Sequence, residues 1–69
     1  MTKITLRAAR VNAGLTQQGM AEKLGVTRDS VAAWETGKIS IKKAHLYAIC
    51  HVTGADPADI FLPEESPKR

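Results

Sequence analysis

Apolar and small residues recur three or four positions apart along most of the chain. Four of the five glycines separate these stretches, namely Gly14, Gly25, Gly37 and Gly54. Each glycine follows a segment with helical spacing, at a point where a residue in the left-handed conformation can end a helix. Because no stretch alternates regularly between apolar and polar residues, we expect an all-α fold of five short helices without strands.

The beginnings of the first three helices can be placed from the sequence. The first helix is expected over residues 5–13. Thr16 and Thr27 stand before the second and third helices, where a threonine side chain can accept a hydrogen bond from a backbone N–H of the first turn. The inward faces of these three helices are expected to consist of Leu6, Ala9, Arg10 and Ala13, then Met20, Ala21 and Leu24, then Val31 and Trp34.

The last two helices are expected after Gly37. The fourth begins near Lys42 and buries some of the residues Leu46, Tyr47, Ile49 and Cys50. Pro57 suits the first turn of a last short helix that ends at Phe61 and Leu62. We therefore expect one domain over residues 1–62, followed by a flexible polar tail at 63–69.

The connection between the second and third helices is the most informative feature of the pattern. Only Leu24-Gly25-Val26-Thr27 joins them, which is too short to let two helices lie antiparallel. The helices must cross steeply, and the small side chain of Ala21 allows them to approach each other. Residues 16–36 therefore have the spacing of a helix-turn-helix.

The sequence resembles the helix-turn-helix regulators that include phage repressor and Cro proteins, often called the xenobiotic-response-element type. The resemblance covers roughly residues 4–62. It is carried by Leu6-Arg7, Gly14-Leu15-Thr16-Gln17, Met20-Ala21-Glu22-Lys23-Leu24-Gly25-Val26, Val31, Trp34-Glu35-Thr36-Gly37-Lys38 and Asp59-Ile60-Phe61. The chain departs from the family pattern at Gly19, Ile41 and Lys43. The resemblance implies a compact repressor-like domain that binds double-stranded DNA as a homodimer and regulates transcription, with a repressor on a palindromic operator as the expected form. It also implies that the contact between the two copies involves the chain after Gly54, especially Leu62 and its neighbours.

The outward face of the third helix suits the major groove of DNA. With Val31 and Trp34 inward, the helical spacing turns Asp29, Ala32, Ala33 and Thr36 outward. This face has no large apolar side chain, so the helix can lie close to base edges. By the resemblance, the base-facing positions are Arg28, Asp29, Ala32 and Ala33. An arginine can bond a guanine with two hydrogen bonds, and alanines can touch thymine methyl groups. Asp29 has an alternative role, because a carboxylate in a first turn is favoured by the helix dipole and can brace Arg28.

Charge is unevenly distributed along the chain, whose formal net charge is +3. Residues 1–43 hold eight lysines and arginines against three carboxylates, whereas residues 44–69 hold two against four. This polarity suits a basic face that lies on phosphates. The expected phosphate contacts are Gln17, Thr27, Lys38, Lys42 and Lys43.

Arg10 shares a helical face with apolar residues, and an unpaired buried charge would be costly. Glu35 lies on the flank of the third helix and is the expected partner. The resemblance supports this pairing, because relatives that match at both positions often pair them. We expect a structural ion pair between the first and third helices.

The composition argues against several other classes of protein. A single cysteine, Cys50, excludes an internal disulfide, and Cys50 with His45 and His51 is too small a ligand set for zinc. We expect no enzyme activity, metal, cofactor or small-molecule ligand, no membrane span, and a cytoplasmic location. Two alternatives remain open: a protein-interaction module, such as a toxin-binding antitoxin with secondary DNA binding, and more remotely a hydrolase built on Cys50 and His51.

Overall fold

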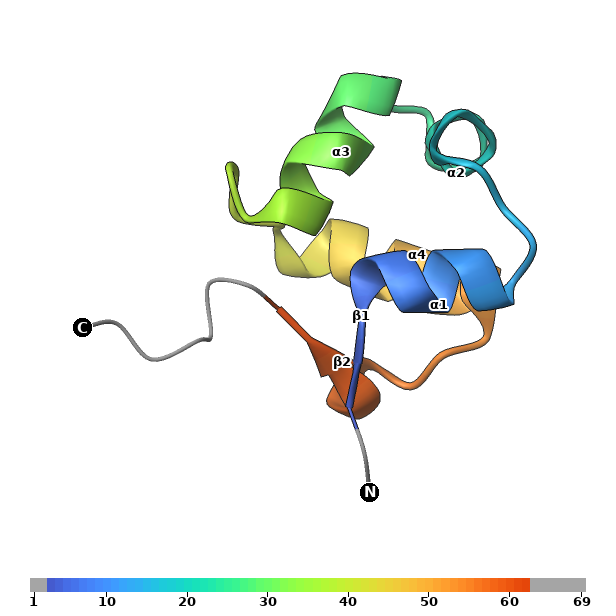
Figure 1. Cartoon of the computed structure of the whole chain (residues 1–69), viewed down its shortest axis with the longest axis vertical. Helices are drawn as coiled ribbons and strands as arrows, with labels where there is room; N and C mark the ends of the chain where they lie inside the picture. The colour runs from blue at the N-terminus through green and yellow to red at the C-terminus, as the bar shows by residue number, and fades with distance from the viewer. Residues whose placement is uncertain (1–2, 63–69) are drawn as a thin grey trace.

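The computed structural model describes residues 3–62, and the tail expected at 63–69 lies outside them. Its elements in chain order are β1 (Ile4–Thr5), α1 (Leu6–Asn12), α2 (Gln17–Leu24), α3 (Arg28–Thr36), α4 (Lys43–Thr53), a 3-10 helix η1 (Pro57–Asp59) and β2 (Ile60–Phe61). In Figure 1, α1 lies in front of part of α4 and contacts it. The helices α2 and α3 lie on one side of this pair, and the two strands lie on the other side.

Threonine side chains cap the first three helices. Thr5 Oγ1 accepts a hydrogen bond from the Ala8 N–H at 3.0 Å, and Thr16 and Thr27 accept from Gly19 and Ser30 at 2.9 and 3.2 Å. Thr5 therefore lies before α1 and not inside it, so the helix begins one residue later than expected. It also ends one residue earlier, at Asn12, and Ala13 is exposed and not inward as expected. Each of these capping bonds satisfies one of the free N–H groups of a first turn, which fixes where the helix begins.

The expectation of five helices without strands is wrong in one region. Asp56 and Pro57 do begin a turn, but it closes only as the three-residue η1. Ile60 is already extended and pairs with Ile4 in a parallel two-stranded sheet, in which Thr5 pairs with Phe61. The pairing places the Ile60 side chain in the core, and this burial outweighs the local preference for another helical turn.

One apolar core holds the elements together. Met20 and Ala21 of α2 and Val31 of α3 are almost completely buried, and Ile49 of α4 packs into the same core. Gly25 adopts the left-handed conformation with φ of 73° and ends α2, and the Val26 N–H then donates to the Ala21 carbonyl oxygen at 3.0 Å. Figure 1 shows α2 nearly end-on while α3 runs across the view, so the two helices cross steeply, as in a helix-turn-helix.

Tyr47 differs from the other apolar residues proposed for the fourth helix. Ile49 and Cys50 are buried and Leu46 packs partly against the core, but the Tyr47 side chain is 55% exposed. A ring with a hydroxyl group satisfies its polar atom in water without needing a buried partner. Tyr47 therefore belongs to the surface of α4.

Candidate nucleic-acid interface

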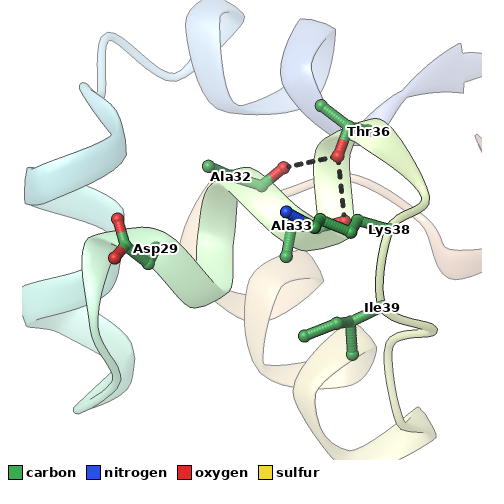
Figure 2. Close-up of a pocket in the computed structure, with 6 residues that line it drawn as sticks. All are labelled: Asp29, Ala32, Ala33, Thr36, Lys38 and Ile39. Atoms are coloured by element: carbon green, nitrogen blue, oxygen red, sulfur yellow. Dashed lines mark hydrogen bonds between the residues drawn. The ribbon is translucent and has the colours of Figure 1, made fainter.

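The outer face of α3 forms the floor of a shallow hollow on the protein surface. Val31 and Trp34 point into the core, so the other side of the helix is left to solvent. The hollow is lined by Asp29, Ala32, Ala33, Thr36, Lys38 and Ile39, shown as sticks in Figure 2. Three of the four expected base-facing residues thus line one surface, and no large side chain of α3 fills it.

Arg28 and Asp29 form a loose pair at the beginning of this face. Arg28 Nη2 lies 3.7 Å from Asp29 Oδ1, and the two side chains are 57% and 91% exposed. An exposed pair at this distance contributes little to stability, so Arg28 can leave it for another partner. Asp29 lines the hollow whereas Arg28 lies outside its lining, at the first residue of the helix.

A buried network behind α3 joins it to the first two helices. Arg10 Nε lies 2.6 Å from Glu35 Oε2, and Arg10 Nη2 donates to Glu35 Oε1 at 3.3 Å. Arg10 Nη1 donates to the Leu15 carbonyl oxygen at 2.8 Å, and Gln17 Nε2 donates to Glu35 Oε1 at 3.1 Å. Both charged side chains are more than 90% buried. The Glu35 carboxylate therefore connects α1, the beginning of α2 and the last turn of α3.

The residues expected to hold phosphates lie around the ends of three helices. Gln17 is the first residue of α2, and its amide already uses one donor on Glu35. Thr27 caps α3 with its hydroxyl group, which also lies 3.0 Å from Ser30 Oγ. Lys42 precedes α4 and makes no side-chain cap, so the first N–H groups of α4 receive no bond from it. Lys38, Lys42 and Lys43 are all exposed, so their charges are available to a partner.

Comparison with known proteins identifies this arrangement. Residues 6–60 match the family described as helix-turn-helix, which covers most of the chain. The chain belongs to the helix-turn-helix family of the Cro/C1 type. The match begins at the first residue of α1 and ends at the first residue of β2, so it takes in α1, α2, α3 and α4.

Three archaeal proteins resemble the chain along most of their length, and each is named as an uncharacterized HTH-type transcriptional regulator. The protein of Methanothermobacter thermautotrophicus is 36% identical over 61 residues, which are 87% of this chain and 88% of the relative. The protein of Archaeoglobus fulgidus is 33% identical, and the match covers 83% of this chain and 81% of the relative. The protein of Methanocaldococcus jannaschii is 35% identical, and the match covers 91% of this chain and 96% of the relative. No solved structure matches the chain significantly.

The helical spacing placed Thr36 on the outward face of α3 but gave it no role, and it did not indicate Ile39 as part of the hollow. Thr36 faces outward, but its hydroxyl group donates back to the carbonyl oxygens of Ala32 and Ala33 at 3.2 and 3.3 Å. Ile39 lies in the loop after α3 and is 56% exposed. An isoleucine is ordinarily a core residue, so nothing in the sequence marks this one as exposed.

His45 and Cys50 both pack against other side chains of this helix-turn-helix protein. The described residues 3–62 contain no group of three or more His, Cys, Asp or Glu side chains that could hold a metal ion. His45 packs its ring on Trp34, with 4.8 Å between the ring centroids. Cys50 is buried, and burial raises the pKa of its thiol, with a smaller contribution from the charge of Asp56. A raised pKa lowers the fraction of reactive thiolate.

Within residues 3–62, no helix is both long and apolar enough to cross a membrane.

Proposed function

We propose that this protein binds double-stranded DNA sequence-specifically and regulates transcription, acting as a homodimeric repressor on a palindromic operator. The observation that carries the proposal is the outer face of α3, which is free of large core side chains and forms the floor of an open hollow. Family membership supports it, because the matched segment contains the whole of this face. The three archaeal relatives bear names of transcriptional regulators.

In the proposed complex, α3 lies in the major groove. Arg28 bonds a guanine, Asp29 accepts from a base or positions Arg28, and the methyl groups of Ala32 and Ala33 lie against apolar base edges. The phosphates on either side are held by Gln17, Thr27, Lys38, Lys42 and Lys43, together with the first N–H groups of α2. The network around Glu35 fixes the angle between α1, α2 and α3, so that both kinds of contact form together.

A single short helix reads few base pairs, so two copies supply the specificity that regulation requires. We expect the contact between copies to lie away from the basic face. The expectation that Leu62 lies in this contact is not supported, because Leu62 is buried in its own domain, whereas the neighbouring Phe61 is partly exposed. Among the described residues after Gly54, Phe61 is the large apolar side chain that is exposed enough to contact another chain.

The test is selection of preferred duplexes from a random pool. We expect a palindromic consensus with half-sites centred about 34 Å apart, which is one turn of DNA. An Ala33→Glu variant should lose the selected sequence, because its larger, charged side chain meets the base edges. Arg7→Ala, which removes an exposed charge on α1, serves as the control and should keep the consensus. If the wild-type protein enriches no sequence, the proposal is wrong, and a protein-interaction module becomes the better interpretation.

A further inference from the structure

Ile39 is a large aliphatic side chain that remains in water beside the proposed reading surface. It is 56% exposed, yet it follows α3 by only three residues and lines the same hollow as Ala32 and Ala33. Figure 2 shows its side chain beside the last turn of α3, on the side toward which the Ala33 methyl group points. Burial against a ligand would remove this apolar area from water.

The backbone around Ile39 is held in place. Gly37 ends α3 in the left-handed conformation with φ of 80°, which turns the chain back along the helix. The Ile39 N–H then donates to the carbonyl oxygen of Ala33 at 3.3 Å. Two residues later, Ile41 is buried in the core. Because the backbone is held before and after Ile39, this segment does not have to become ordered when a ligand binds. This lowers the entropy lost on binding.

The part of the hollow next to Ile39 offers mostly methyl groups. Ala32 and Ala33 contribute theirs, and the hydroxyl of Thr36 donates to backbone carbonyls, so its hydrogen is not available to an acceptor on a base edge. Lys38 stands beside this apolar strip and supplies a positive charge that suits a phosphate. Among the base edges in the major groove, the apolar group is the C5 methyl of thymine.

We propose that Ile39 is a specificity-determining residue, which packs together with Ala33 on the C5 methyl group of a thymine in each half-site. This inference rests on the proposed function and adds a reading residue outside the recognition helix. It assigns the end of the hollow that is distant from Arg28 to an A·T base pair. Lys38, one position earlier in the chain, holds the adjacent backbone and contributes no base preference.

The experiment replaces each thymine of the selected operator with uracil, which lacks only the C5 methyl group. Binding of the wild-type protein should weaken by about four-fold per half-site at the thymine that Ile39 contacts, as expected for one buried methyl group. Ile39→Ala should bind the thymine and uracil duplexes equally at that position. Ile39→Val, which keeps a branched apolar side chain, should retain most of the difference. The matched control Lys38→Ala should weaken both duplexes by the same factor.

Other outcomes overturn the inference in distinguishable ways. If Ile39→Ala weakens every duplex equally and leaves the effect of uracil unchanged, Ile39 contacts the sugar-phosphate backbone and reads no base. If the variant instead changes the oligomeric state in sedimentation, Ile39 lies between two copies of the chain. If the wild-type protein selects an operator but no uracil effect depends on Ile39, the inference fails while the proposed function stands. If the wild-type protein selects no operator, both fail.

Discussion

Arg10 Nε and Glu35 Oε2 lie 2.6 Å apart, in an ion pair that is more than 90% buried and joins α1 to α3. Both side chains have further partners, because Arg10 donates to the Leu15 carbonyl oxygen and Glu35 accepts from Gln17. The pair therefore sets the position of α3 relative to the beginning of α2. The two parts of the proposed DNA surface, the reading face of α3 and the phosphate-binding end of α2, share this support.

Replacing Arg10 with methionine should lower the free energy of unfolding by about 3 kcal/mol, because Glu35 and the Leu15 carbonyl oxygen would lose a buried partner. Urea denaturation followed by circular dichroism measures the change. The double variant Arg10→Met with Glu35→Leu should recover part of this stability, since it removes the unpaired carboxylate. A double variant no more stable than the single one would show that the pair is not energetically coupled.

Gly19 and Thr16 should depend on each other. A Cβ atom built at Gly19 would lie 3.2 Å from Thr16 Oγ1, the atom that caps α2. Gly19→Ala gains about 1 kcal/mol of helix propensity, but the cap that it displaces contributes about as much. The single change should therefore leave the free energy of unfolding nearly unaltered, as thermal and urea denaturation would show. In a Thr16→Ala background the same change should stabilise by about 1 kcal/mol, and equal effects in both backgrounds would exclude this coupling.

Cys50 should make stability depend on pH in the alkaline range. Because burial, aided by the charge of Asp56, raises the pKa of its thiol, the folded protein keeps this proton to higher pH than the unfolded chain does. The contribution of the protonated thiol to the free energy of unfolding is fully present below the ordinary thiol pKa of about 8.5. It is lost as pH rises through the raised pKa of the folded state.

The matched control for this pH dependence is Cys50→Ala, measured by urea denaturation between neutral and alkaline pH. The variant should be less stable at neutral pH because of the cavity, and the difference from wild type should shrink as pH rises. Parallel curves would mean that Cys50 does not contribute to the pH dependence. The variant should also keep its DNA affinity. If the wild-type protein hydrolyses a substrate and the Cys50→Ala variant does not, Cys50 has a catalytic role instead.

DNA binding should fall steeply with salt. If each subunit neutralises about four phosphates, a dimer should show a slope of about −7 in a plot of log K against log salt concentration. Fluorescence anisotropy at several salt concentrations measures this slope on the selected operator. A slope between zero and about −2 would show that the lysines after α3 do not hold the DNA backbone.

Local signals were sufficient to predict the helices around the turn. Thr16 and Thr27 cap their helices, and Gly25 ends α2 in the left-handed conformation, because each of these effects involves residues within one turn. The strand at Ile60 could not be found in this way, since its partner Ile4 lies at the other end of the chain. A two-residue strand also carries too little alternation to be recognised.

The outward face of α3 was predictable from local signals as well. The helical spacing of Val31 and Trp34 already indicates which side of α3 faces outward. The hydrogen bond between Gln17 and Glu35 depends on how three helices pack, and the sequence places neither residue near the other. Ile39 is a case of the same kind, because its exposure follows from the path of the loop after Gly37 and not from its own chemistry.

The most direct test of α3 as the reading helix compares Arg28→Ala with Lys43→Ala on the selected operator, on each of its single-base variants and on unrelated duplex. Arg28→Ala should cost about 1 to 3 kcal/mol on the operator and relax the preference at one base position per half-site. Lys43→Ala should weaken all duplexes alike, keep the consensus, and reduce the magnitude of the salt slope by about one for each phosphate that the variant no longer neutralises. If Arg28→Ala weakens all duplexes equally while Lys43→Ala alters the consensus, α3 is not the reading helix.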